Sequence, residues 1–254
     1  MRWIDTHCHL YSEEFNSDIE ELIERAKGTG VDRFYLPAID SNTLQAMLAL
    51  ESKHPECISM IGLHPCYVNA TFEQELVIVK EWLDKRHFVA IGEIGLDYYW
   101  STEFAAQQAV AFNQQMQWAL DYNLPIVIHT RNAMQSTIDA VKPFAAKGLR
   151  GIFHCFSGDA NEAEQVVNMG FYLGIGGILT YKKSGLPEAL TNIPLEKIVL
   201  ETDAPYLPPV PYRGKRNESS YIPIIAKKLA EVKNIPLEEV ATVTTANAEK
   251  IFGS

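Results

Sequence analysis

The chain has 254 residues, 47% of them hydrophobic, which is enough apolar material for one large core. Its formal net charge of −10 argues against a broad basic surface for gripping nucleic acid, but it is compatible with a phosphate held by metal ions and a few local cations. Short apolar runs, an N-terminus without signal-peptide features and four cysteines that form no disulfide framework predict a cytoplasmic protein with no membrane contact.

Eight short segments rich in Val, Ile and Phe predict strands buried on both faces of a parallel sheet. They are Trp3–Thr6, Val31–Ala38, Ile58–Leu63, Phe88–Ile94, Pro125–Thr130, Leu149–Cys155, Phe171–Ile175 and Lys197–Thr202. Apolar residues at helical spacing predict helices between most of these strands and after the last one. The predicted helices are Asp18–Lys27, Phe104–Tyr122, Met134–Ala146, Asn161–Met169, Tyr221–Val232 and Leu237–Phe252. The segment Ser184–Asn192 is too short for a clear helical pattern.

This alternation predicts an α/β protein, namely a single-domain (β/α)8 TIM barrel over residues 1–254 in which the helices of 218–252 complete the barrel. A doubly wound open sheet is the alternative, although no G-x-G-x-x-G sequence supports it. In a barrel, the functional side chains stand at the carboxyl ends of the strands.

Metal-binding residue types stand at the ends of the predicted strands. His7 and His9 are two residues apart, so both imidazoles point the same way and can chelate one ion, while Cys8 faces the opposite layer. Glu93 in an apolar strand is costly unless it is paired or coordinating, and its two oxygens can bridge two ions. His129 and His154 end the next two strands and fit a second ion, although each one alone also fits a hydrogen-bonded core histidine.

The last strand ends with Glu201 and Asp203. Asp203 can ligate the first ion and accept a proton from water, so Asp203 and Glu93 are the predicted catalytic residues. Glu201 lies one layer deeper on the same face, which indicates that it orients a ligand or pairs with a cation. His64 is predicted to contact substrate or to support the ligands, with direct metal binding as the alternative.

Other chemistries fit the sequence less well. Cys8, Cys66 and Cys155 lie near these histidines, so zinc binding by thiolates is a competing interpretation, but their spacing is not that of a structural zinc site. A Ser-His-Asp hydrolase is disfavoured because there is no G-x-S-x-G segment. Mixed imidazole and carboxylate ligands around two neighbouring ions favour hydrolysis of an ester, an amide or a phosphodiester.

Among these three substrate classes, the basic and aromatic residues of the chain favour a phosphodiester. Arg213 and Arg216, with Lys215 between them, follow the last strand, and guanidinium groups match phosphate oxygens. Lys182 and Lys183 form a second basic pair, which is equally compatible with solvated surface. Aromatic residues in the same loops can stack on bases or pack within the loops; they are Tyr98, Tyr99, Trp100, Tyr206 and Tyr212.

The chain resembles the TatD family of metal-dependent deoxyribonucleases, within the amidohydrolase superfamily. The resemblance rests on segments along its whole length: IDTHCHL, GLHP, GEIGLDYY, LPIVIHTRNA, GIFHCFSGD, GFYLGIGG, ETDAPYLPP, RGKRNE and TTANAEKIF. The chain departs from the family pattern at Tyr11, where many members have Asp or Asn, at Cys66, where His is common, and at Ser219, where Pro follows RGKRNE. These departures affect substrate contacts and loop stiffness but remove no metal ligand.

The resemblance implies a (β/α)8 barrel with two divalent metals. It implies a first ion bound by His7, His9, Glu93 and Asp203, a second ion bound by Glu93, His129 and His154, and a phosphate-facing role for His64, Arg213 and Arg216. It also implies DNA as the usual substrate, with RNA and D-aminoacyl-tRNA esters as further associations.

These observations together predict a deoxyribonuclease that removes nucleotides from an end of single-stranded DNA, or of RNA, with no obligate protein partner. The alternatives are an ester or amide hydrolase such as a D-aminoacyl-tRNA deacylase, and a non-catalytic metal-binding protein. The ion is left open between magnesium, manganese and zinc, because imidazole favours zinc whereas carboxylate and phosphate favour magnesium or manganese.

Overall fold

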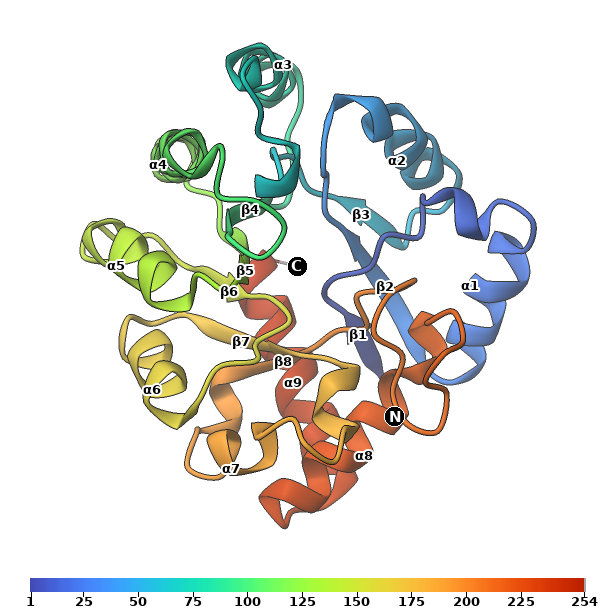
Figure 1. Cartoon of the computed structure of the whole chain (residues 1–254). Coiled ribbons are helices and arrows are strands. Elements are labelled where there is room, and N and C mark those ends of the chain that lie inside the picture. Colours follow the sequence, from blue (N-terminus) through green and yellow to red (C-terminus); the bar gives the residue numbers. More distant parts are fainter. Residues whose placement is uncertain (254) are drawn as a thin grey trace.

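The computed structural model describes residues 1–253 and shows a parallel barrel of eight strands surrounded by helices (Figure 1). The strands are β1 (Trp3–Asp5), β2 (Val31–Leu36), β3 (Cys57–Ser59), β4 (Ile91–Asp97), β5 (Ile126–Arg131), β6 (Gly151–Phe153), β7 (Tyr172–Ile175) and β8 (Ile198–Leu200). The helices are α1 (Ile19–Gly28), α2 (Ser41–Lys53), α3 (Phe72–Lys85), α4 (Ala105–Asp121), α5 (Met134–Ala145), α6 (Ala160–Asn168), α7 (Leu186–Leu190), α8 (Ile222–Lys233) and α9 (Leu237–Phe252). This architecture is the predicted (β/α)8 barrel.

Two parallel sheets, β1-β2-β3 and β4-β5-β6-β7-β8, join to close the barrel. One seam is a parallel bridge between Ile61 and Ile91. The other seam is made by Thr6, whose backbone N–H and hydroxyl both donate to the carbonyl of Leu200, at 3.1 and 3.0 Å. Every strand therefore ends at the same rim of the barrel, as the predicted site requires.

The opposite end of the barrel is filled by one inward-facing residue from each strand or its flank and is covered by the end of α9. The strand-borne residues are Ile4, Tyr35, Met60, Ala90, Val127, Ile152, Tyr172 and Val199, and Ala248, Ile251 and Phe252 of α9 pack against them. The ring of Phe252 stacks on that of Tyr35 at 3.9 Å between centroids. Figure 1 shows α9 running behind the strands, while α8 lies on the outside like the other helices.

The two helices α2 and α3 were not predicted, and several strand ends differ from the prediction. Helix α3 buries Phe72, Leu76, Val79 and Leu83 at helical spacing, a pattern that the sequence carries. Helix α2 buries only Leu44 and Met47 and has little amphipathic signal, so its main marker is Asp40, whose carboxylate caps it by accepting from the N–H of Thr43. Strand β4 continues to Asp97, three residues beyond the predicted end at Ile94.

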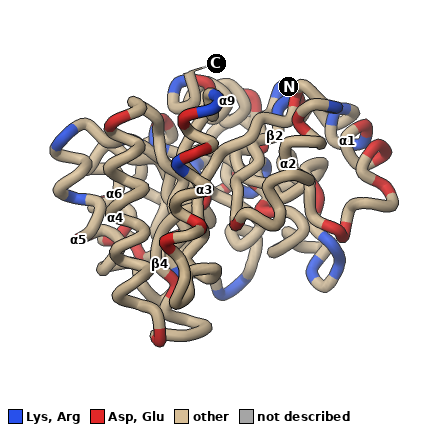
Figure 2. The backbone as a smooth tube through the Cα atoms, turned by 90° about the horizontal axis from the view of Figure 1, so that it is seen from above, with Lys and Arg blue, Asp and Glu red and all other residues tan. Residues whose placement is uncertain are grey.

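Acidic and basic residues are intermixed over the outer helices (Figure 2), in keeping with the formal net charge of −10. Within residues 1–253, no helix has the length and apolar character needed to cross a membrane.

Candidate metal centre

The carboxyl ends of the strands bring six predicted ligands together in one cluster. His7 and His9 follow β1, His154 follows β6 and Asp203 follows β8, while Glu93 and His129 lie within β4 and β5. Glu93 stands at the middle of the cluster and is only 2% exposed. Asp203 has a left-handed backbone (φ +57°), and its N–H donates to the carbonyl of His7 at 2.9 Å. This turn places its carboxylate against the histidines of β1.

The first group of donor atoms surrounds a space of the right size for one ion. The Nε2 atoms of His7 and His9 lie 3.3 Å apart, and they lie 3.2 and 3.6 Å from Oε2 of Glu93. Oδ1 of Asp203 is 3.7 Å from His7 Nε2 and 3.4 Å from His9 Nε2. Ligands about 2.0–2.2 Å from a tetrahedral ion are separated by about 3.4 Å, so these four residues fit a divalent metal.

The second group uses the other oxygen of Glu93. Oε1 lies 2.9 Å from Nδ1 of His129 and 3.2 Å from Nε2 of His154. Glu93, His129 and His154 therefore form a separate group of potential ligands beside the first. The two oxygens of one carboxylate face two donor groups, which is the arrangement that a bridging ligand needs.

Three hydrogen bonds orient the imidazoles so that the other ring nitrogen of each faces Glu93 or Asp203. His129 donates from Nε2 to Asp97 Oδ2 at 2.8 Å, and His154 donates from Nδ1 to Glu201 Oε1 at 3.0 Å. His9 donates from Nδ1 to the hydroxyl of Tyr11 at 3.0 Å, and that hydroxyl donates to the carbonyl of Pro37 at 2.6 Å. The metal-facing nitrogens are therefore His129 Nδ1, His154 Nε2 and His9 Nε2.

Glu201 is fully buried beneath His154. Its Oε1 also accepts the N–H of Cys155 at 2.5 Å, while its Oε2 has no hydrogen-bond partner. A Cβ at position 174 would lie 2.2 Å from Oε2, so Gly174 of β7 leaves the space that this carboxylate occupies. Glu201 therefore contacts His154 directly, and its role in orienting that ligand stays a prediction.

The electrostatics favour ionised carboxylates, whereas the imidazoles differ from one another. Burial opposes ionisation of Glu93, but the nearby imidazoles of His64, His154 and His7 hold its pKa well below the usual range. Burial likewise opposes ionisation of Asp203, but the adjacent imidazoles of His9, His154 and His7 lower its pKa, with His9 the largest of these contributions. Burial opposes the charged forms of His129 and His154, but the hydrogen bonds of His129 with Asp97 and Glu93, and the charges of Glu201 and Glu93 beside His154, raise both pKa values. Burial, reinforced by the neighbouring His154, lowers the pKa of His7 and keeps its lone pair available.

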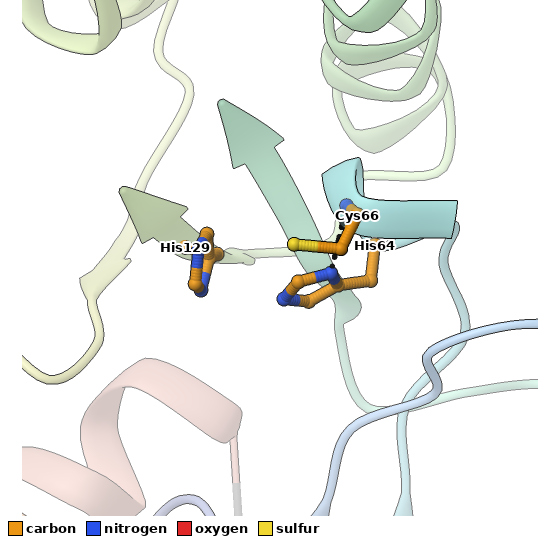
Figure 3. Close-up of side chains that lie close together, drawn as sticks. All are labelled: His64, Cys66 and His129. Carbon is orange, nitrogen blue, oxygen red and sulfur yellow. Dashed lines mark hydrogen bonds between the residues drawn. The ribbon is translucent and has the colours of Figure 1, made fainter. Parts of the chain in front are cut away.

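His64 lies beside this centre with Cys66 and His129 (Figure 3). Nδ1 of His64 accepts the N–H of Cys66 at 3.0 Å, so Nε2 carries the hydrogen that faces Glu93 Oε1 at 3.3 Å. Burial and the charge of Asp97 raise the pKa of the Cys66 thiol to about 12. Because His64 has no spare lone pair and the thiol is protonated, this trio is poorly suited to a thiolate-bound ion.

The arginines of the RGKRNE segment separate in the structure. Arg216 forms a two-point ion pair with Asp18 at 2.9 and 2.6 Å and lies over the ring of Phe15. Arg213 lies over the ring of Tyr181, 4.5 Å from its centroid, and is exposed. The phosphate-binding role of either arginine stays a prediction, and Arg216 already has a protein partner.

The predicted aromatic residues have different surroundings in the structure. The ring of Tyr206 is 52% exposed and lies 5.9 Å from that of His9, directly beside the centre. Tyr212 stacks on Tyr221 at 4.3 Å, which is packing within the loop. Tyr99 and Trp100 are 50% and 71% exposed.

Three residues near the centre were not among the predicted site residues: Tyr11, Asp97 and Arg131. The guanidinium of Arg131 lies 3.6 Å from the ring centroid of Tyr99 and 5.2 Å from that of Trp100. Asp97 lies four residues after Glu93, and Arg131 lies two after His129, so alternation along the strands places each on the face of the ligand that it follows. That parity was the signal in the sequence for both.

Comparison with known proteins gives a consistent result. The profile of a family described as TatD related DNase matches residues 4–253. A protein named as the uncharacterized metal-dependent hydrolase YabD of Bacillus subtilis is 39% identical over 249 residues, covering 98% of both chains. A protein of Erwinia tasmaniensis named 3'-5' ssDNA/RNA exonuclease TatD is 32% identical over 255 residues, again covering 98% of both. The crystal structure of YjjV, a TatD homologue from Escherichia coli, superimposes with a TM-score of 0.94 at 29% identity and covers 100% of this chain and 98% of its own.

Proposed function

The chain belongs to the TatD family and is a metal-dependent hydrolase, and from this premise we propose that it cleaves phosphodiester bonds of single-stranded DNA from an end. The observation that carries the proposal is Glu93, whose two oxygens face two separate groups of imidazole and carboxylate donors. We propose that His7, His9, Glu93 and Asp203 hold one divalent ion and that Glu93, His129 and His154 hold another. Such ions supply Lewis acidity to phosphate oxygens and acidify water.

The protein groups have distinct roles in this proposal. Asp203 accepts the proton of the attacking water, because its carboxylate is ionised, lies at the edge of the first group and retains some exposure. Glu93 contributes one carboxylate oxygen to each donor group and so sets the spacing between the two ion sites. His64 presents an N–H beside Glu93, where it can donate to a phosphate oxygen that enters the centre.

A nucleic-acid substrate is supported by the surroundings of the centre. Tyr206 offers an exposed ring next to His9, and Tyr99, Arg131 and Trp100 form a cation–aromatic stack on another flank. Bases stack on such rings without regard to sequence. The Erwinia relative is named as an exonuclease of single-stranded DNA and RNA, which points to the same substrate class.

The test is hydrolysis of end-labelled single-stranded DNA by protein stripped of metal and refilled with magnesium, manganese or zinc. Stepwise shortening that requires metal and disappears in Asp203→Asn is the expected result, and the most effective ion identifies the cofactor. If metal-loaded protein cleaves no strand with any ion, the proposal is wrong, and ester or amide substrates such as D-aminoacyl-tRNA become the next to test.

A further inference from the structure

A cavity of about 500 Å³ lies between the loop after β7 and the loop after β8. Its walls include Ile178, Tyr181, Lys182, Lys183, Val210 and Arg213. Both loops leave the carboxyl ends of their strands, so the cavity lies at the same end of the barrel as the candidate metal centre. Its volume falls within the range of about 300–1,000 Å³ that is usual for ligand sites.

The cavity concentrates positive charge in a chain that is acidic as a whole. Lys182 and Lys183 come from one loop and Arg213 from the other, and the residues that line the cavity include no carboxylate. Among residues 1–253, no carboxylate forms an ion pair with any of these three cations. Three unpaired cations around one hollow form a local anion-attracting field, in contrast to Arg216, which Asp18 neutralises.

The backbone around these cations is held in place. The hydroxyl of Tyr181 donates to the carbonyl of Pro208 at 2.9 Å, and the N–H of Val210 donates to the hydroxyl of Thr180 at 2.8 Å. A Cβ at Gly177 would lie 2.2 Å from the carbonyl oxygen of Leu207, so the two loops are in close contact. The ring of Tyr181 also carries the guanidinium of Arg213. The cations therefore project from two mutually anchored segments, which limits the entropy lost on binding.

The cavity is connected to the metal centre through the loop after β8. The N–H of Tyr206 donates to the carbonyl of Asp203 at 2.8 Å, and two residues further on the carbonyl of Pro208 accepts the hydroxyl of Tyr181 at 2.9 Å. Tyr181 lines the cavity. One short segment, residues 203–208, therefore holds both a predicted metal ligand and the wall of the basic cavity.

We propose that this cavity binds the sugar-phosphate backbone of a single-stranded nucleic acid while another phosphodiester of the same strand occupies the metal centre. The inference rests on the proposed function and deepens it, because it makes the substrate a chain of several nucleotides. Lysines neutralise phosphates as point charges, and the arginine fork can contact two phosphate oxygens. A half-open hollow with three exposed cations suits a flexible single strand, whereas a duplex needs a broad basic face.

The test is binding of a fluorescent phosphorothioate strand of about 12 thymidines, which resists cleavage, to the metal-loaded protein. We expect Lys182→Ala/Lys183→Ala to weaken binding about five- to tenfold. The slope of log Kd against log salt concentration should also fall, by about 0.7 for each phosphate that a lysine no longer neutralises. Affinity for a dinucleotide, whose single phosphodiester can occupy only one of the two sites, should change far less. The matched control is Lys227→Ala/Lys228→Ala, an adjacent lysine pair in α8 that removes the same charge.

Equal affinity of the two double variants for the long strand would overturn the proposal. Failure of the metal-loaded wild-type protein to bind that strand would also overturn it. Competition by polyglutamate as strong as that by unlabelled strand would also overturn it, since the cavity would then be a general anion site. Metal-dependent hydrolysis of bis(p-nitrophenyl) phosphate is measured in parallel. If the wild type hydrolyses this small diester but the two double variants bind the long strand equally well, only the cavity proposal is wrong. If the variants differ in binding but no hydrolysis occurs, the proposed function is wrong and the binding site is retained.

Discussion

Tyr11 is not a predicted metal ligand, but its hydroxyl orients the imidazole of His9, which is one. Its hydroxyl donates to the carbonyl of Pro37 and so offers its oxygen to the Nδ1–H of His9. That bond leaves Nε2 of His9 unprotonated and directed at Glu93 and Asp203. The phenol therefore connects the carbonyl of Pro37 to the imidazole and supplies the acceptor that orients it.

The contact between Tyr11 and His9 predicts that Tyr11→Phe weakens metal retention. The ring stays in place, but His9 loses its acceptor and the tautomer is no longer fixed, which typically costs about tenfold or more in metal affinity. The measurement is metal content after dialysis against graded chelator, with calorimetric titration of the stripped protein. Tyr122→Phe, which removes a surface hydroxyl that contacts Asp84, is the control and should retain metal like the wild type. Unchanged retention in Tyr11→Phe would show that His9 needs no partner.

The sequence singled out the residues that stand at strand ends and also Glu201 beneath His154, but it gave no reason to place Tyr11 beside His9. His7, Glu93, His129, His154 and Asp203 carry a strong signal because titratable groups are unusual in apolar runs. Tyr11 gives no such signal, since a tyrosine near a turn is ordinary and its role depends on the carbonyl of Pro37, which no local pattern reveals. The predicted arginine cluster illustrates the same limit, because the partner of Arg216 lies 198 residues away at Asp18.

At the scale of elements, α9 closes the end of the barrel that carries no predicted ligand. Ala248, Ile251 and Phe252 form its buried end and complete a layer to which every strand or its flank contributes one residue. The chain therefore folds its last helix across its first strand, and Thr245 of α9 donates to the carbonyl of Arg2 at 3.1 Å. Barrel closure thus depends on contacts between the two ends of the chain.

We expect Phe252→Ala to lower the free energy of unfolding by about 3 kcal/mol, because it removes a ring that is 7% exposed and stacked on Tyr35. Chemical denaturation measures the loss, and metal content should stay at the wild-type level since the change lies at the other end of the barrel. Val110→Ala on α4, at a residue 57% exposed, is the control and should change stability by less than about 0.5 kcal/mol. A loss of the same small size in Phe252→Ala would mean that α9 does not seal the barrel.

Elements with a clear apolar run or an apolar helical stripe can be predicted from the sequence, and this includes α3, although the prediction missed it. Elements defined by their neighbours cannot. The eight strands follow from runs such as Pro125–Thr130, which became β5 with both faces buried at its start. Helix α2 has few buried residues, so its pattern is weak, and β3 is reduced to Cys57–Ser59 because the following segment pairs with β4 only through the bridge at Ile61. Long-range pairing of this kind is set by closure of the barrel.

At the scale of the whole molecule, the candidate centre joins strand ends from both sheets. His7 and His9 belong to the end of β1, whereas Glu93, His129, His154 and Asp203 belong to β4 through β8. Ions bound between them would therefore link the two sheets across the rim.

This arrangement predicts that divalent metal stabilises the fold as a whole. A ligand that binds only the folded chain, at about 100 times its Kd, adds about 2.7 kcal/mol, which is about 5–10 °C in Tm for a domain of this size. Calorimetry of chelator-treated and metal-saturated protein measures the shift, with metal content determined on the same samples. In Glu93→Gln, which keeps the shape but loses the charge that faces both donor groups, the shift should largely disappear. An identical Tm for stripped and fully loaded wild type would mean that the folded chain binds the ions no better than the unfolded chain does, which contradicts a site that exists only when the two sheets are joined.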